Sequence, residues 1–240
     1  MAALAKSGDL RQVAAMVLFM FSGREMRLVD GKAVHWPEQE ALLLADLHLE
    51  KASFFARFGQ MLPPYDSRET LERIALAIRT TGARRVFALG DNFHDPRGPA
   101  RLEPHAAGML AALTRAVEWV WIVGNHDQDG TGDTGGEALE DVELGGIVLR
   151  HKALAGETRP ELSGHFHPRI TLSARGRKIA RACAVRSETR MILPAFGALT
   201  GGMDAADPVI LEAMQPASAI DAILPATGRL VEFPLWRSAA

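Results

Sequence analysis

Two kinds of apolar pattern alternate along the first half of the chain. Residues 26–29 and 33–36 flank Asp30-Gly31, a pair that favours the type I′ turn of a β-hairpin. The continuous apolar run at 41–45 is typical of a strand that is buried on both faces. The pattern therefore predicts a hairpin followed by a central strand.

A helix is predicted after this strand. Apolar residues recur at helical spacing between positions 71 and 78. Asp66 with Glu69 three residues later has the form of a capping box, so we place the N-cap at Asp66. Gly82 stands where a C-cap glycine is expected. The helix should therefore extend from Asp66 to Gly82.

The alternation then repeats. Apolar runs at 85–89 and 119–123 predict strands, and the spacing from 106 to 117 predicts a helix between them. Strands alternating with helices imply right-handed crossovers and a parallel sheet. We expect the second half to be β-rich and to pack a second sheet against the first. Its strand-like segments are short and lie at 147–149, 170–172, 178–185 and 191–193.

The composition fits one domain of ordinary globular type. Of 240 residues, 48% are apolar, which is enough for one sizeable core. We place a single domain at residues 24–240 and an N-terminal extension at residues 1–23. The apolar stretch 13–21 imitates a signal peptide, but it is too short to span a membrane and no Ala-x-Ala cleavage pattern follows. We interpret it as helical or frayed, and expect a cytoplasmic protein.

Cysteine content and charge narrow the class of protein. Cys183 is the only cysteine, so no intramolecular disulfide can form. We interpret it as a small buried apolar residue rather than a reactive thiol. The net charge of −2 argues against a uniformly basic surface for nucleic acid, although it leaves room for a local basic strip.

Polar residues directly follow the predicted strands. Asp46 and His48 come after the first buried strand, and Asp91 comes after the second. The carboxyl ends of parallel strands are where open α/β sheets bind their ligands. The same kind of residue recurs after the third strand and in the second half, at Asn125, His126, His151, His165 and His167.

These residue types indicate a metal centre. Residues i and i+2 at a strand end project the same way, so both members of an Asp-x-His or His-x-His pair can reach one cation. Carboxylate, imidazole and amide ligands without thiolate suit Mn, Fe or Zn better than Mg or Ca. One aspartate can bridge two metal ions, which together would hold a hydroxide and clamp an in-line phosphoryl displacement. The glycines at 90, 124 and 164 would allow the backbone bends that bring the loops together.

The order of these segments resembles the signature of the calcineurin-like metallophosphoesterases. Asp-x-His at 46–48, Gly-Asp at 90–91, Gly-Asn-His-Asp at 124–127, a lone His151 and Gly-His-x-His at 164–167 occur in that order. The resemblance implies an α/β fold, an αββα sandwich of two mixed β-sheets flanked by helices. It also implies a phosphoesterase that depends on two divalent metal ions, with Mn favoured and Fe or Zn as alternatives.

The resemblance further implies a role for each candidate residue. His126 would not be a metal ligand but the general acid for the leaving oxygen, a task that suits an imidazole near neutral pH. The implied ligands are Asp46, His48 and His167 for the first metal ion, Asp91 as the bridge, and Asn125, His151 and His165 for the second.

A narrower resemblance, over about residues 25 to 205, is to the PdeM family of bacterial DNA ligase-associated phosphoesterases. Segments such as 90–95 and 193–197 carry it. It implies cleavage of DNA phosphodiesters in repair, and functional association with DNA ligase and helicase. Leu199 and Lys152 depart from the family's pattern, where an aromatic and an acidic residue are expected, which puts the substrate preference in doubt.

Other polar residues near the signature have two interpretations each. His94 and Asp95 either face the phosphate or cap their loop. Ser53, Arg57 and Gln60 follow the first ligand pair and form a sensible rim for a substrate. Arg57 would there contact phosphate, or it is a solvated loop arginine.

Two segments after the third strand also carry charge. The loop at 127–132 imitates a calcium-binding loop but lacks suitable ligands at two positions, so we expect a flexible loop beside the site. Between residues 169 and 190, seven side chains are basic and one is acidic. This basic strip either holds a nucleic-acid backbone in the cleft or discourages pairing at a sheet edge.

Three classes of function are compatible with these residues. The first is a metal-dependent phosphodiesterase or nuclease that acts on DNA. The second is a hydrolase of a small nucleotide, a pyrophosphate or a phosphomonoester, because the metal chemistry acts on the phosphoryl group whatever the leaving group. The third is a metal-free interaction scaffold, as in the retromer subunit of similar fold, against which the complete ligand set and His126 argue.

Overall fold

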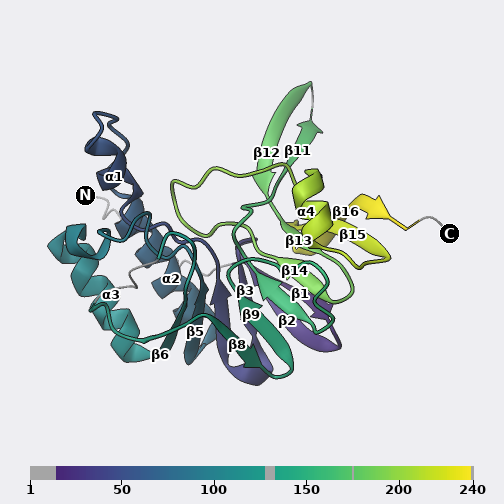
Figure 1. The fold of residues 1–240 in the computed structure, drawn as a ribbon, viewed down its shortest axis with the longest axis horizontal. Coiled ribbons are helices and arrows are strands. Elements are labelled where there is room, and N and C mark those ends of the chain that lie inside the picture. Colours follow the sequence, from purple (N-terminus) through teal and green to yellow (C-terminus); the bar gives the residue numbers. More distant parts are fainter. Residues whose placement is uncertain (1–14, 128–132, 175, 239–240) are drawn as a thin grey trace, which may run out of the picture.

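Two seven-stranded β-sheets face each other in the computed structural model, which describes residues 15–127, 133–174 and 176–238 (Figure 1). The first sheet keeps the order of the chain: β1 (Met16–Phe21), β2 (Arg24–Val29), β3 (Ala33–Trp36), β4 (Ala41–Leu44), β5 (Arg85–Leu89), β6 (Glu118–Ile122) and β7 (Glu137–Leu139). Neighbours from β1 to β4 are antiparallel, and those from β4 to β7 are parallel. The predicted hairpin and the predicted parallel strands are thus confirmed.

Local sequence explains both features. Asp30 and Gly31 have positive φ angles of 48° and 70°, as the type I′ turn between β2 and β3 requires. In β4, Leu42 packs towards the helices and Leu43 towards the second sheet, and neither is exposed. Burial of each leucine contributes about 1.5–3 kcal/mol relative to exposure, which is why this continuous apolar run is a central strand.

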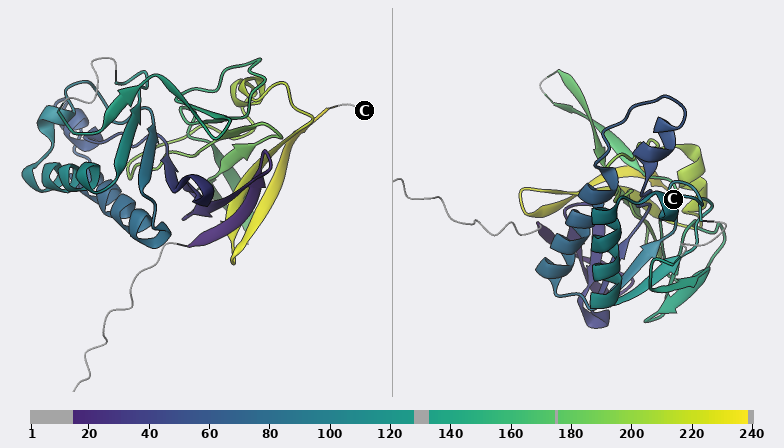
Figure 2. Two further views of the ribbon diagram at one scale, coloured as in Figure 1. Left: turned by 90° about the horizontal axis from the view of Figure 1, so that it is seen from below. Right: turned by 90° about the vertical axis from the view of Figure 1, so that its left-hand side faces the viewer.

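Two helices cover the outer face of the first sheet (Figure 2). They are α2 (Asp66–Thr81) and α3 (Pro104–Ala116), the crossovers that connect β4 to β5 and β5 to β6. A shorter helix, α1 (Lys51–Ala56), precedes α2 in the chain. It lies next to α2 and projects beyond the first sheet (Figure 1). Gly82 ends α2 in the left-handed conformation, as predicted.

The predicted N-cap of α2 is wrong by one residue. Tyr65 occupies the N-cap position without a side-chain hydrogen bond, and Asp66 is the first helical residue. The carboxylate of Asp66 is buried and accepts the N–H of Ala52 at 3.0 Å, so it joins α2 to α1. This contact between segments takes precedence over the local capping pattern.

The second sheet is mixed and is made by the second half of the chain. Its pairs are antiparallel except that β10 runs parallel to both β14 and β9. One short helix, α4 (Pro208–Ala213), packs on its outer face. The strands in spatial order are β16 (Arg229–Arg237), β15 (Ala219–Ala226), β13 (Ala184–Arg186), β14 (Arg190–Ile192), β10 (Glu161–Ser163), β9 (Ile147–Arg150) and β8 (Asp141–Leu144).

A separate antiparallel hairpin, β11 (Arg169–Ala174) and β12 (Arg177–Ala182), projects from the sandwich (Figure 1). The single strand predicted at 178–185 is therefore wrong. The chain divides at Cys183, because β12 is largely exposed whereas Cys183 and the start of β13 are buried. Burial also raises the pKa of the Cys183 thiol to about 12, which confirms a buried apolar role.

The core has three apolar layers. The central layer lies between the sheets and includes Trp36, Phe87 and Leu149. A second layer lies between the first sheet and α2 with α3, and a third lies between the second sheet and α4. The arrangement of helix, sheet, sheet and helix confirms the predicted αββα sandwich.

The N-terminal stretch is a strand rather than a helical or frayed segment from residue 16 onward. In β1, every second side chain is buried, a period that suits a strand at the edge of a sheet. Residues 1–14 lie outside the described residues, and the domain limits at 23 and 24 stay a prediction. None of the helices described is long and apolar enough to cross a membrane.

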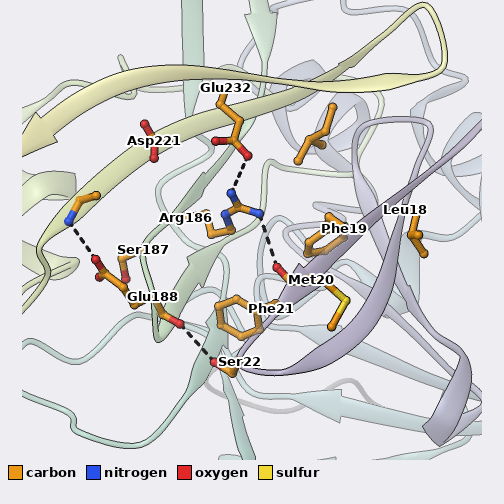
Figure 3. Close-up of a pocket in the computed structure, with 12 residues that line it drawn as sticks. Leu18, Phe19, Met20, Phe21, Ser22, Arg186, Ser187, Glu188, Asp221 and Glu232 are labelled. Carbon is orange, nitrogen blue, oxygen red and sulfur yellow. Dashed lines mark hydrogen bonds and ion pairs between the residues drawn. The ribbon is translucent and has the colours of Figure 1, made fainter.

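The edge strands of the two sheets, β1 and β16, lie side by side (Figure 2). A hollow of about 540 Å³ lies in this seam, bridged by Arg186, which contacts Met20 O at 3.5 Å and Glu232 at 2.6 Å (Figure 3). None of the predicted site residues lines this hollow. We interpret the contacts of Arg186 as structural contacts that join the two sheets.

Candidate metal centre

The predicted site residues come together between the two sheets. Loops after β4, β5 and β6 carry Asp46, His48, Asp91, Asn125 and His126, at the carboxyl edge of the parallel strands. Loops after β9 and β10, which are parallel neighbours in the second sheet, carry His151, His165 and His167. Each sheet therefore supplies part of one site.

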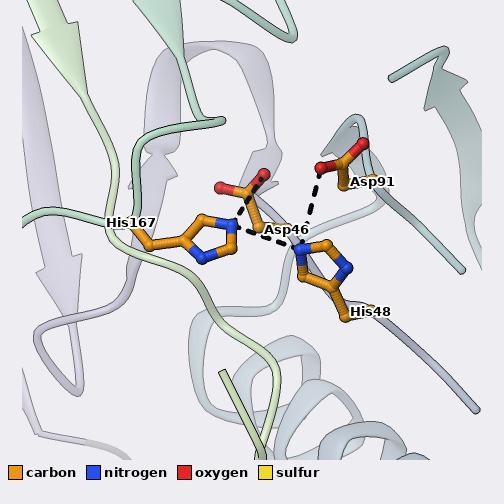
Figure 4. A group of neighbouring side chains, drawn as sticks. All are labelled: Asp46, His48, Asp91 and His167. Atoms are coloured by element: carbon orange, nitrogen blue, oxygen red, sulfur yellow. Dashed lines mark hydrogen bonds and ion pairs between the residues drawn. The ribbon is translucent and has the colours of Figure 1, made fainter. Parts of the chain in front are cut away.

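The first cluster joins Asp46, His48, Asp91 and His167, each with one donor atom within 4.8 Å of the others (Figure 4). The Nε2 atoms of His48 and His167 are 3.2 Å apart. His167 Nε2 lies 3.5 Å from Asp46 Oδ1, and His48 Nε2 lies 3.7 Å from Asp91 Oδ2. Three of the four side chains are buried, and His167 is half-buried. The four side chains could hold one cation.

The second cluster joins Asp91, His151 and His165. His151 Nε2 lies 3.4 Å from Asp91 Oδ1, 3.1 Å from His165 Nδ1 and 3.0 Å from Asn125 Oδ1. Asp91 thus directs Oδ1 to this cluster and Oδ2 to the first cluster. One carboxylate stands between two groups of ligands.

Backbone carbonyls fix the tautomers of two histidines. His151 Nδ1–H donates to Leu89 O at 3.0 Å, because a carbonyl can only accept, and this leaves Nε2 as the free donor atom that faces Asp91. In the same way His126 Nδ1–H donates to His94 O at 2.8 Å. His126 Nε2 then faces Asp91 Oδ2 at 3.9 Å, and its side chain is 38% exposed, so a substrate can reach it.

Burial favours the neutral form of two of the imidazoles, those of His48 and His165. Desolvation lowers the pKa of His48 to about 2 and that of His165 to about 4, with repulsion from neighbouring basic groups adding to the effect. Desolvation also raises the pKa of Asp46, which is fully buried. A divalent cation binds to neutral imidazole nitrogens and stabilises the ionised form of a buried carboxylate. The residues present therefore fit such an ion.

The backbone of the site is held in an uncommon conformation. Non-glycine residues rarely have positive φ, and each such residue costs on the order of 1–3 kcal/mol. Five predicted ligands have it: Asp46 at 53°, His48 at 43°, Asp91 at 48°, His165 at 75° and His167 at 49°. The surrounding sheets must supply this energy, as is typical of functional sites.

The glycines of the signature serve close approach as well as bending. Gly90 has a φ of 78°, as the predicted bend requires, but a Cβ there would also lie 2.3 Å from His151 Nδ1. Gly124 has no positive φ, and a Cβ there would lie 2.2 Å from Asp91 N and 2.5 Å from Asp91 Oδ1. A turn begins at Gly124, whose O accepts the N–H of Asp127 at 3.1 Å, and the lack of space for a Cβ is a second reason for glycine there.

Two residues of the loop after Asp91 have separate environments. His94 faces the site: its Nδ1 lies 3.4 Å from His48 Nδ1, and its ring stacks on His126. Asp95 instead accepts hydrogen bonds from the Arg101 guanidinium and from Arg97 N–H, and so caps the loop. The two predicted alternatives apply to one residue each.

The proposed rim after β4 is also divided. Ser53 Oγ donates to Glu50 O and accepts from Arg101 Nε, so it belongs to the structure of α1. Arg57 and Gln60 are exposed. Exposure is compatible with both predicted roles of Arg57, a contact to phosphate and a solvated loop arginine. Residues 128–132 of the expected flexible loop lie outside the described residues.

One residue with a structural role in the site had no role predicted from the sequence. Asp127 is 1% exposed, and its carboxylate accepts N–H groups from Asn92, Phe93 and Gly124 at 3.0–3.2 Å. It ties the loop of Asp91 to the loop of Asn125 and His126. The signal was present, since Asp127 ends the Gly-Asn-His-Asp segment, but its contacts depend on the fold.

Solved structures include one that matches most of this chain. The solved structure of a nuclease named MPE from Pseudomonas putida covers 91% of this chain and 100% of its own, with a TM-score of 0.69 and 28% sequence identity. Yfce, a phosphoesterase from E. coli, covers 81% of this chain and 98% of its own, but its TM-score of 0.39 and identity of 16% carry no argument. No protein-family model and no curated protein matches the sequence.

The protein is a metal-dependent phosphoesterase. Its two-sheet sandwich has clustered aspartates and histidines at the carboxyl edge of the strands, and the nuclease structure matches it over most of its length. Such an enzyme uses divalent metal ions, for which these clusters are suited. The match is consistent with the resemblance to the calcineurin-like metallophosphoesterases. The narrower resemblance to the PdeM family stays a prediction.

Proposed function

We propose that the protein is a phosphodiesterase with two metal ions that cleaves DNA. The observation that carries the proposal is the position of Asp91, whose two oxygens face two separate groups of ligands at 3.4 and 3.7 Å. The first ion would have Asp46, His48 and His167, and the second would have Asn125, His151 and His165, with Asp91 as the bridge. Mn, Fe or Zn suits this set of oxygen and nitrogen donors, and we favour Mn because of the sequence resemblance.

Two divalent cations bound there would activate the attacking water at neutral pH and neutralise the charge on the phosphoryl group. The chain itself orients the ligands through backbone contacts, such as His165 N–H with Asp46 and His126 N–H with Asp91 Oδ1, both at 3.0 Å. His126 would protonate the leaving oxygen from Nε2, because its Nδ1 proton is engaged by His94 O. The role of general acid thus agrees with the orientation of the ring.

The likeness to a nuclease supports a nucleic acid as the substrate, since the match covers 91% of this chain and all of the nuclease. The choice of DNA within that class comes from the sequence resemblance. A role in repair, with functional association with DNA ligase and helicase, is part of the proposal through the sequence resemblance. Hydrolysis of a small nucleotide, a pyrophosphate or a phosphomonoester would use the same residues, so it is the alternative that a comparison of substrates must exclude.

Asp91→Asn should abolish the hydrolysis of both bis-p-nitrophenyl phosphate and single-stranded DNA, and should reduce the bound Mn from two ions per chain. The loss should exceed roughly a thousandfold, because metal ions contribute several kcal/mol to the transition state. Asp133→Asn, at an exposed position, is the matched control. Retained activity in purified Asp91→Asn would contradict the metal mechanism. Turnover of a cyclic nucleotide or p-nitrophenyl phosphate far above that of DNA would favour the alternative.

A further inference from the structure

A cleft of about 440 Å³ adjoins the candidate metal centre. His167, a predicted ligand of the first ion, lines it together with Pro168 and Arg169. The turn between β2 and β3 contributes Lys32, and the loop at 195–201 forms another wall. A ligand that fills this cleft therefore lies beside the site of hydrolysis rather than in it.

Lys32 brings a poorly solvated positive charge into this cleft. Its side chain is half-buried, and it has no hydrogen bond and no ion pair with any residue that the structure describes. Burial, with repulsion from Arg73 and Arg169, lowers the pKa of its ammonium group to about 8, and a smaller attraction to Glu69 acts in the opposite direction. Such a group is costly in the free protein, and a bound anion would remove most of the cost.

Arg169 supplies the second charge. Its Nε–H is buried without an acceptor, and its one side-chain hydrogen bond among the described residues is a long one, from Nη2 to Ala180 O at 3.5 Å. The stem lies against Gly202, where a Cβ would come within 2.6 Å of Arg169 Cγ and Cδ. The glycine-rich loop thus leaves room for this arginine beside the cleft.

The other cations of the basic strip are used differently. Arg186 pairs with Glu232, and Arg190 is buried and donates to Ala213 O and Glu157 O. Arg177 and Lys178 are exposed at the end of the hairpin and do not line the cleft.

Arg181 lines the cleft, but strand alternation puts its side chain on the face of the hairpin opposite that of Arg169. The acid of the cleft, Asp30, accepts the N–H of Ala15 through Oδ1. Lys32 and Arg169 are therefore the two partly buried cations that line the cleft, whereas Arg181 is exposed.

We propose that this cleft binds a phosphate of the DNA strand that neighbours the phosphate being cleaved. The inference rests on the proposed function, because it assigns a second contact to the same substrate. A phosphate suits the pair chemically: arginine presents a planar fork of N–H groups and lysine presents a point charge, and both are common ligands of phosphate. The cleft would then select a strand over an isolated phosphodiester, which has no neighbouring phosphate.

The experiment combines a protein variant with a neutral substrate. Single methylphosphonate groups, which carry no charge, replace each phosphate of a single-stranded oligonucleotide in turn, and kcat/KM is measured for the Mn-loaded enzyme. For the wild type, a methylphosphonate at one position beside the cleavage site should reduce kcat/KM by about tenfold, as expected for loss of a charged hydrogen bond. Lys32→Ala should reduce kcat/KM on the native strand by a similar factor. In this variant, the methylphosphonate at that one position should cause no further reduction.

Controls separate a local site from a diffuse charge effect. Lys178→Ala removes the same charge from the exposed hairpin and should leave the methylphosphonate profile of the wild type unchanged. Lys32→Gln keeps most of the stem, and Mn content with thermal unfolding shows that each variant is folded and loaded. If Lys32→Ala and Lys32→Gln retain the wild-type profile, or if Lys178→Ala reproduces their effect, the cleft has no such role. If the wild type fails to cleave the strand while it hydrolyses small esters, the proposed function itself fails.

Discussion

The two clusters of the candidate site have similar donor atoms but different access to solvent. In the first cluster Asp46 and His48 are 0% and 5% exposed and His167 is half-buried. In the second His151 is buried and His165 is half-buried, so the difference lies in Asn125, the further proposed ligand of the second ion, which is exposed. Electrostatic interactions are stronger where water is excluded. We therefore expect the first cluster to hold its ion firmly, and the second to exchange its ion more readily.

The difference follows from where the loops lie. Asp46 follows β4, a strand with neighbours on both sides in the first sheet, and its carboxylate also accepts the N–H of His165. Asn125 follows β6 at the start of a loop whose residues 128–132 are outside the described part. A ligand anchored in the core and a ligand at a loop are thus combined in one site.

The largest expected effect separates the clusters directly. His48→Ala should remove the ion of the first cluster and reduce kcat on bis-p-nitrophenyl phosphate by roughly a thousandfold or more, because several kcal/mol of charge stabilisation are lost. His165→Ala should be less severe and should be partly rescued by added Mn, since water can replace a ligand at an exposed site. Metal titrations with activity as the readout measure both. A rescue of His48→Ala at lower Mn than His165→Ala would reverse the comparison.

A smaller effect is expected at Asp127, which positions the loop of the second cluster. Asp127→Ala leaves three backbone N–H groups without an acceptor and should lower the free energy of unfolding by about 1–3 kcal/mol. Because Asn125 is two residues away, Mn at the second site should be weakened more than Mn at the first. Chemical denaturation and metal titration test this, with the exposed Asp133→Ala as the control. Equal weakening of both sites would show that Asp127 supports the whole centre.

The smallest effect concerns pH. The pKa of His165 is lowered from 6.5 to about 4 by burial, so between these values the unfolded chain binds a proton that the folded chain does not. This contribution to the stability of the metal-free protein is complete above pH 6.5 and is lost as the pH falls towards 4. The melting temperature of the metal-free wild type should fall across this window, and less so in His165→Asn. A variant with an unchanged slope would assign the effect to other groups, such as His94 and His48.

The predictions from sequence succeeded where local pattern and final environment agree. The buried run at 41–45 was predicted to be a central strand, and Asp46, His48 and Asp91 were expected together because parallel strands end at a common edge. The spacing of the signature also led to the residues that now form the two clusters.

The failures have one physical origin, which is contact between distant segments. The capping pattern at Asp66 is overruled by the N–H of Ala52, and the run at 178–185 is divided because Cys183 turns into the core. The position of Lys32 beside the site could not be foreseen, since it lies 135 positions before His167 and the two residues line the same cleft only in the folded chain. Such contacts leave no periodic trace in the sequence.

The left-handed backbone at five of the ligands limits how this site can be re-engineered. Aspartate, asparagine and histidine tolerate that conformation better than most residues, so each position selects a side chain for its backbone as well as for its donor atom. An exchange for cysteine, intended to favour a softer metal, would meet a conformational penalty before any gain in affinity. Transplanting the centre into another scaffold would accordingly require copying the loops, because the side chains alone do not carry the geometry.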